Sequence, residues 1–217
     1  MILLIARLRD RARRISHQIF GSRLGHGCPV SNAVWEEQYS KGIWSVLEES
    51  PYQIQYEAVA GICLESNSRK SKILDVGCGE GWLLAHLMQC GFESPGYQGL
   101  DVSSVAVRKA ISRYPHAHFS QADAEHYLPP ESFDIIVFNE SLYYFARPLK
   151  VINRYRRALN PGGIFVISMC DYQGNPAIWR KLDGYFPCTK RTEVMNSRQQ
   201  RWEIAVYRPD NANSKGG

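Results

Sequence analysis

The sequence predicts an α/β fold built on a doubly wound, mostly parallel sheet. Two observations support this prediction. Short apolar runs of strand length alternate with helical segments along most of the chain, and the first of these strands ends in a glycine-rich turn. Residues 72–84 contain that strand, the turn and the start of a helix. Units of this kind build ligand sites at the carboxyl edge of a parallel sheet.

The glycine turn contains the residues that discriminate between ligands. Gly77, Gly79 and Gly81 alternate with other residues, so the backbone can turn tightly and approach a ligand that a Cβ would obstruct. A dinucleotide fingerprint is G-x-G-x-x-G, whereas this chain has G-x-G-x-G with Trp82 in place of the last glycine. Asp75 precedes the turn and would repel a pyrophosphate. The site therefore favours a ligand with cationic and hydroxyl groups, and S-adenosylmethionine fits that description.

At this turn the sequence resembles the class I S-adenosylmethionine-dependent methyltransferases. The most specific match is L-D-V-G-C-G-E-G at residues 74–81, where Cys78 replaces the family's usual small residue, and the resemblance extends over residues 35–208. It implies a Rossmann-like sheet of seven strands with an antiparallel last strand, an N-terminal helical lid, and S-adenosyl-L-methionine as the cofactor. We therefore expect the methyltransferase domain to span residues 35–209.

The composition is that of one globular domain. The 217 residues are 44% apolar and 22% charged, which is enough for a sizeable core. The net charge of +5 is concentrated in an arginine-rich first segment, which argues against a nucleic-acid groove on the main domain. Six cysteines without metal-ligand spacing are expected to be free thiols in a reducing cytoplasm. No apolar run approaches the ~20 residues that cross a bilayer.

Residues 1–34 are expected to form a basic amphipathic helix and a linker ahead of the domain. Isoleucines and leucines share one stripe of residues 2–20 while arginines occupy the rest. One interpretation is a helix packed on the domain. The other is an interfacial helix that contacts an anionic membrane surface or a partner through residues 1–20. Residues 210–217 are expected to be a disordered tail.

The W-E-E-Q-Y run at residues 35–39 opens the domain and precedes a helix predicted over about residues 51–64. The resemblance implies that this segment closes over the cofactor, with Tyr39 near its methionine end. A tyrosine that packs the lid on the core is the alternative interpretation.

The second strand, residues 97–101, ends in Asp101 and leads into a helix over residues 104–114. Asp101 follows Gly81 by 20 positions, the separation at which an acid reaches ribose hydroxyls in such folds. We assign Asp101, with Val102 beside it, to the cofactor ribose, because a carboxylate accepts from both hydroxyls. The helix N-cap is assigned to Ser103.

The third strand and its exit span residues 117–124. The resemblance implies that Asp123 and Ala124 flank the adenine, with the acid accepting from its exocyclic amine. An ordinary loop aspartate is the alternative for Asp123.

The fourth strand, residues 133–138, is followed by N-E-S-L-Y-Y, which should border the transferred methyl group at the carboxyl edge of the sheet. Asn139 is expected to contact the cofactor. Glu140 is placed to orient or deprotonate an acceptor. Tyr143 and Tyr39 are placed to bind the acceptor or to shield the sulfonium, although Tyr143 is equally consistent with a core aromatic. No metal site is expected.

The rest of the chain predicts a helix over residues 148–159, an N-P-G-G turn, a strand over residues 164–169 and a helix over residues 175–184. Residues 193–196 and 200–208 are expected to form the closing hairpin. No histidine falls at a base position of the family, and His126 is the least implausible exception.

The predicted function is methyl transfer to a nitrogen or oxygen of a small molecule, with sugars and lipid-linked glycans as candidate acceptors. The N-E-S-L exit differs from the D/N-P-P-Y/F of enzymes that methylate nucleic-acid bases, so no nucleic-acid partner is expected. A non-catalytic cofactor-binding or regulatory protein is the alternative. A nicotinamide-dependent oxidoreductase is opposed by Asp75 and the shortened glycine pattern. We expect a cytoplasmic monomer or homodimer, with membrane association if residues 1–20 bind a lipid surface.

Overall fold

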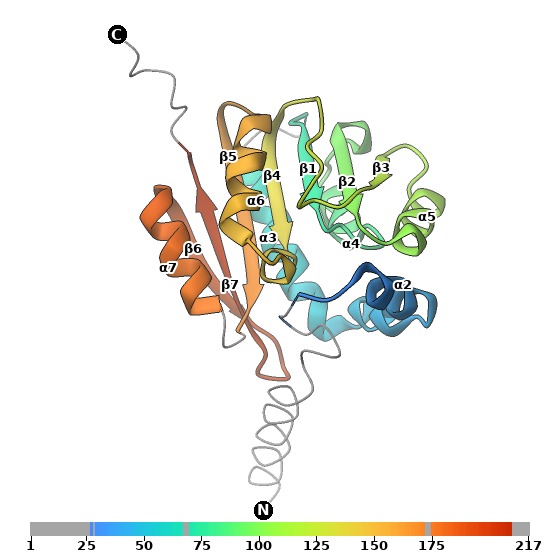
Figure 1. The fold of residues 1–217 in the computed structure, drawn as a ribbon. Helices are drawn as coiled ribbons and strands as arrows, with labels where there is room; N and C mark the ends of the chain where they lie inside the picture. Colours follow the sequence, from blue (N-terminus) through green and yellow to red (C-terminus); the bar gives the residue numbers. More distant parts are fainter. Residues whose placement is uncertain (1–26, 28, 67–69, 172–174, 210–217) are drawn as a thin grey trace, which may run out of the picture.

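The computed structural model describes residue 27 and residues 29–66, 70–171 and 175–209. Seven strands in this part of the chain form one sheet with the order β3-β2-β1-β4-β5-β7-β6 (Figure 1). Their bounds are β1 Ile73–Val76, β2 Tyr97–Asp101, β3 His118–Gln121, β4 Phe133–Asn139, β5 Leu159–Cys170, β6 Cys188–Met195 and β7 Arg201–Tyr207. The pairs among β1 to β5 are parallel, and β7 is antiparallel to both of its neighbours. The predicted seven-stranded, mostly parallel sheet is therefore confirmed.

Helices cover both faces of the sheet, and one helix lies beyond its carboxyl edge (Figure 1). Their bounds are α2 Asn32–Ser40, α3 Ser50–Ser66, α4 Trp82–Gln89, α5 Ser104–Arg113, α6 Pro148–Tyr155 and α7 Asn175–Tyr185. Four short 3₁₀ helices are η1 Ile43–Glu48, η2 Ser94–Gly96, η3 Leu142–Tyr144 and η4 Arg156–Ala158. Helices α3 and α4 pack on one face and α6 and α7 on the other, while α5 packs beside β2 and β3. Helix α2 lies beyond the carboxyl edge of the sheet and packs against α5, where a lid is expected.

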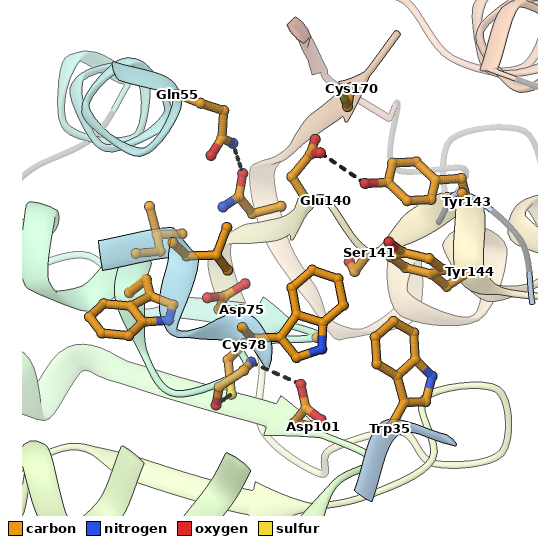
Figure 2. Close-up of a pocket in the computed structure, with 18 of the residues that line it drawn as sticks. Trp35, Gln55, Asp75, Cys78, Asp101, Glu140, Ser141, Tyr143, Tyr144 and Cys170 are labelled. Carbon is orange, nitrogen blue, oxygen red and sulfur yellow. Dashed lines mark hydrogen bonds between the residues drawn. The ribbon is translucent and has the colours of Figure 1, made fainter. Parts of the chain in front are cut away.

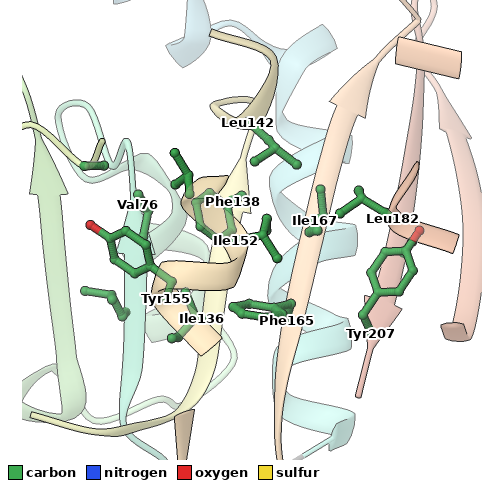
Figure 3. Packing of buried hydrophobic residues seen from close by; sticks show 14 of the residues in the cluster. Val76, Ile136, Phe138, Leu142, Ile152, Tyr155, Phe165, Ile167, Leu182 and Tyr207 are labelled. Carbon is green, nitrogen blue, oxygen red and sulfur yellow. The ribbon is translucent and has the colours of Figure 1, made fainter. Parts of the chain in front are cut away.

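The central strands are buried on both faces, which explains their nearly continuous apolar sequences. In β4, Ile136 and Phe138 belong to the core under α6 and α7, whereas Ile135 and Val137 belong to the core under α3 and α4. This alternation follows from the period of two along a strand. Figure 3 shows the first core, in which Phe138 packs edge-on against Tyr155 of α6 at a centroid distance of 5.7 Å.

Two elements differ from the sequence-based boundaries. Strand β6 begins at Cys188, five residues before the predicted start. The prediction missed these residues because they are mostly exposed and show no alternation of apolar and polar side chains. Strand β5 begins at Leu159 and includes the N-P-G-G turn, while the preceding helix ends at Tyr155. Its pairing with β4 shifts register between Phe133 and Ile135, which accommodates the turn.

Several predictions fall on residues that the structure does not describe. The amphipathic helix over residues 2–20, most of the linker over residues 21–29 and the tail over residues 210–217 lie outside the described residues. The domain boundaries therefore stay a prediction. The cysteines in the described part, at positions 63, 78, 90, 170 and 188, are free thiols. Among the described helices, none combines the length and the apolar character that crossing a membrane requires.

Helix α4 offers a test of the core packing. Leu84 is fully buried against the sheet, so Leu84→Ala is expected to lower the free energy of unfolding by about 2–5 kcal/mol. Met88, on the same helix, is 44% exposed, and Met88→Ala serves as the control with a change below about 0.5 kcal/mol. Urea denaturation of both variants measures the difference. Equal effects would contradict the described orientation of α4.

Candidate active site

A cavity of about 1540 Å³ opens at the carboxyl edge of the sheet, between its strand ends and α2. Figure 2 shows its two ends: Asp75, Cys78 and Asp101 lie at the glycine-turn end, and Glu140, Tyr143 and Cys170 lie at the Glu140 end. All but one of the predicted site residues line it, namely Tyr39, Asp75, Gly77, Cys78, Gly79, Asp101, Val102, Asp123, Ala124, Asn139, Glu140 and Tyr143. Gly81 does not line the cavity; a Cβ there would lie 3.0 Å from the Tyr114 ring.

The glycine turn has no room for a side chain at Gly77 or at Gly79. Gly77 has φ +83°, and a Cβ would lie 2.5 Å from the Ser141 Cβ. Gly79 has φ +54°, and a Cβ would lie 2.8 Å from the Tyr39 hydroxyl. Both backbone conformations are ones that L side chains rarely adopt. The turn therefore presents bare backbone to the cavity.

Asp75 is a buried acid with an unused oxygen. It is 1% exposed, and the Tyr97 hydroxyl donates to its Oδ2 at 2.6 Å. Its Oδ1 has no hydrogen-bond partner among the described residues. Burial, reinforced by the Asp101 charge and opposed by the Tyr97 hydrogen bond, raises the pKa of Asp75 to about 7. Because an unpaired buried acid is costly, this wall of the cavity suits a ligand that supplies a cationic donor.

Asp101 is fixed by the backbone at the end of β2. The amides of Gly79 and Ser103 donate to its two oxygens at 2.8 and 2.9 Å. Burial raises the pKa of Asp101 to about 6, although these amide hydrogen bonds oppose the rise. Ser103 caps α5 as predicted, since its Oγ accepts from the Ala106 amide at 3.2 Å. The carboxyl group is thus held in one orientation beside the glycine turn.

Helix α2 is tied to α5 at two points, through Glu36 and through Tyr39, and we call these contacts the α2–α5 latch. Glu36 accepts from the Ser103 hydroxyl at 2.9 Å and from the Ser104 and Val105 amides at 2.7 and 3.1 Å. Lys109 donates to the Tyr39 carbonyl at 2.9 Å. Burial raises the pKa of Glu36, but the hydrogen bonds from the start of α5 outweigh it and hold that pKa at about 2.

Aromatic side chains of the lid segment form one wall of the cavity. Tyr39 is 8% exposed and places its hydroxyl against Gly79. Trp35 meets Tyr144 edge-on at a centroid distance of 4.8 Å (Figure 2) and lies 5.8 Å from Trp44. This contact spans from α2 to η3, so the lid contacts both ends of the cavity. Tyr39 both packs the lid and lines the cavity, so its two interpretations both remain.

Glu140 follows β4 and lies in the wall of the Glu140 end. It has φ +57°, a left-handed conformation that is rare for a residue with a Cβ. The Tyr143 hydroxyl donates to its Oε2 at 2.8 Å and the Ser168 hydroxyl to its Oε1 at 3.4 Å. Burial raises the pKa of Glu140 to about 8, against the lowering effect of these hydrogen bonds. The group is therefore protonated at neutral pH until a ligand changes its surroundings.

Asn139 is held by a residue that the sequence did not single out. The Gln55 Nε2 of α3 donates to the Asn139 Oδ1, and also to the Ser168 Oγ at 2.9 Å (Figure 2). Ser168 interrupts a buried apolar run in β5, and that interruption was the available signal. Gln55 lies on a helix without a motif, and Glu36 lies in the W-E-E-Q-Y run at a position to which the resemblance gave no role, so no signal in the sequence identified them.

Asp123 lies at the rim of the glycine-turn end. Its Oδ1 accepts from the Glu125 amide at 2.9 Å, and its Oδ2 lies 2.8 Å from the His126 Nδ1. Ala124 beside it is buried. These contacts fit a loop aspartate, and the position on the cavity fits a ligand contact, so both interpretations of Asp123 remain.

The family model described as a methyltransferase domain matches residues 67–206. The chain belongs to the class I methyltransferases. The family predicted from the strand–glycine turn–helix unit is therefore confirmed.

Several curated methyltransferases are similar to this chain over about half of their own length. A trans-aconitate 2-methyltransferase of Rhodopseudomonas palustris (strain BisB18) is 29% identical over 146 residues, which are 67% of this chain and 54% of that protein. A malonyl-(acyl-carrier protein) O-methyltransferase of Halalkalibacterium halodurans is 28% identical over 134 residues, which are 58% of this chain and 48% of that protein. The chain therefore spans about half the length of these relatives.

A solved methyltransferase structure has the same fold. The N-methyltransferase NodS from Bradyrhizobium japonicum WM9, in complex with S-adenosyl-L-homocysteine, matches with a TM-score of 0.66. The match covers 80% of this chain and 97% of that chain at 18% identity. At that identity the likeness shows the fold alone.

The α2–α5 latch of this methyltransferase domain is expected to depend on pH. Glu36→Gln should lower the free energy of unfolding at neutral pH by about 1 kcal/mol, because charge-assisted hydrogen bonds become neutral ones. The folded-state pKa of Glu36 lies below its ordinary value of 4.5, at about 2. Its contribution is therefore complete above 4.5 and is lost as the pH falls towards 2.

Urea denaturation at neutral pH and at about pH 2.5 measures this contribution. Glu37→Gln is the matched control, because the Glu37 side chain is 61% exposed and pairs with Lys41 at the surface. Equal losses in the two variants at neutral pH would refute the latch.

Proposed function

We propose that the protein transfers the methyl group of S-adenosylmethionine to a nitrogen or oxygen of a small molecule, with sugars and lipid-linked glycans among the candidate acceptors. One observation carries the proposal. A single cavity joins the glycine turn and its two acids to the acid and aromatic side chains at the Glu140 end. Such a cavity holds a donor and an acceptor side by side, which is what a direct transfer requires.

The residues at the glycine-turn end fit this cofactor. The unused Asp75 Oδ1 suits the cofactor's ammonium group, and the Asp101 carboxyl suits the ribose hydroxyls. The bare backbone at Gly77 and Gly79 admits a ligand that a Cβ would exclude. We assign Cys78, Val102, Asp123, Ala124 and Asn139 to its remaining contacts. When bound, the cofactor supplies a methyl group that its sulfonium has already activated.

The protein's own task is then positioning and exclusion of water. The lid helix α2, held by the α2–α5 latch, covers the glycine-turn end and brings Tyr39 and Trp35 over the cavity. Glu140 and Tyr143 orient the acceptor, and Glu140, once ionised, receives the proton that the acceptor loses. Membrane contact through residues 1–20, a cytoplasmic location and a monomeric or homodimeric state are part of the same proposal.

Calorimetric titration with S-adenosylhomocysteine tests the cofactor assignment. We expect selective binding, with no binding of NAD or ATP, because Asp75 repels phosphate groups at the turn. Binding without methyl transfer to any acceptor would favour a non-catalytic regulatory protein. A folded protein that does not bind S-adenosylhomocysteine would refute the proposal.

Two variants locate the cofactor within the cavity. Gly79→Val should abolish binding, because the side chain collides with Tyr39 and requires a rare backbone conformation. Asp101→Ala should weaken binding by about 1–3 kcal/mol through lost charge-assisted hydrogen bonds. Gly184→Val is the control, since nothing lies within 4 Å of a Cβ at that exposed position. Wild-type affinity in Gly79→Val would move the cofactor away from the turn.

A further inference from the structure

The Glu140 end of the cavity contains a carboxyl group that is surrounded by hydrogen-bond donors but has no cationic partner among the described residues. The Tyr143 and Ser168 hydroxyls donate to it, and the Trp202 indole and the Cys170 amide do the same. Donors of this kind favour the charged form of a carboxyl group. A carboxyl group held by donors in this way, with no cation beside it, is suited to a ligand that brings a positive charge.

The arginines nearest to this end are already engaged. Arg198 and Arg201 line the cavity. Arg198 donates to Glu49 at 2.6 Å and lies over the Tyr52 ring, 5.5 Å from its centroid. Arg201 donates to Asp171 at 2.9 Å. An acceptor that carries a carboxylate would therefore meet arginines that already pair with other carboxylates at the surface.

The backbone of Glu140 is held in a rare left-handed conformation by neighbouring hydrogen bonds. Its φ of +57° is rare outside glycine, and the Glu140 amide donates to the Ser168 carbonyl at 3.0 Å. The next residue, Ser141, donates from its hydroxyl to the Val76 carbonyl at 2.5 Å and so fixes the exit of β4 against β1. Rare backbone conformations of this kind persist where the surrounding contacts enforce them, and they cluster at functional sites.

We propose that the acceptor of this protein is an amine, and that its nitrogen binds the Glu140 carboxyl. The proposal rests on the function proposed above and names its substrate class. The nitrogen lone pair forms the new C–N bond while the methyl–sulfur bond breaks, and the sulfur keeps that electron pair as a neutral thioether. The positive charge thereby moves from sulfur to nitrogen. One N–H proton then passes from the product ammonium to Glu140 and from there to water.

Four titratable groups among the described residues face Glu140. They are Tyr56 of α3, Tyr143 and Tyr144 of η3, and Cys170 of β5. Burial and the Glu140 charge raise the pKa values of Tyr56 and Tyr144, and raise that of Cys170 to about 12. With a pKa of about 8, Glu140 is partly ionised near that pH, and its ionised form accepts the proton from the product ammonium of an amine that attacks in its neutral form.

Matched acceptors test the substrate class. The protein is incubated with S-adenosylmethionine labelled in its methyl group and with three sets of acceptors. Within each set the carbon skeleton is alike and the compounds differ in carrying an amine, a hydroxyl or a carboxylate. These are glucosamine, glucose and glucuronate; benzylamine, benzyl alcohol and benzoate; and hexylamine, hexanol and hexanoate. We expect label in the amine members at least about tenfold above their hydroxyl and carboxylate counterparts.

The outcomes separate this inference from the proposed function. Label that prefers hydroxyls or carboxylates overturns the amine inference alone, and so does a protein that binds S-adenosylhomocysteine but labels no amine. A protein that does not bind S-adenosylhomocysteine overturns the proposed function instead.

A binding measurement distinguishes the amine from the other cation in the reaction, the sulfonium itself. S-Adenosylmethionine carries the sulfonium charge and S-adenosylhomocysteine lacks it. In Glu140→Gln, the affinities for both are expected to stay within about threefold of wild type, while labelling of the preferred amine falls at least about tenfold. Selective loss of affinity for S-adenosylmethionine would make the sulfonium the partner of Glu140 and overturn the inference. Glu131→Gln, at an exposed position outside the cavity lining, is the matched control.

Discussion

The site depends on the hydrogen bonds that join the glycine turn after β1 to the end of β2. The Gly77 and Cys78 amides donate to the Leu100 carbonyl at 2.7 and 2.9 Å, and the Gly79 amide donates to Asp101. These bonds fix a left-handed backbone that has no side chain to stabilise it. The position of Asp101, the start of α4 and the floor of the cavity all follow from this one junction between adjacent parallel strands.

The cavity is lined by three buried acids that carry no ion pair with a cationic side chain among the described residues. Asp75, Asp101 and Glu140 all have pKa values raised by burial, and they are spread from one end of the cavity to the other. Burial makes ionisation of these acids unfavourable, and a ligand that brings a positive charge or hydrogen-bond donors offsets that effect.

Local signals predicted most of the fold and part of the site. The buried run of β1, the glycines behind it and the acid at the end of β2 all lie between residues 73 and 101, so local patterns and spacing identified them. Strand β6 was placed too late, because an exposed edge strand has no apolar period to reveal it. The contacts of Glu36 with α5 and of Gln55 with Asn139 join residues more than 60 positions apart, and no local pattern encodes such pairs.

The α2–α5 latch has a consequence for the order of events at the site. Ser103 donates its amide to Asp101 and its hydroxyl to Glu36, so one residue connects the cavity floor to the lid. Any ligand that steadies Asp101 thereby also steadies the closed lid, and the two equilibria are thermodynamically linked. Because the lid covers the glycine-turn end of the cavity, we expect a ligand held there to bind before the lid closes and to leave only after it opens.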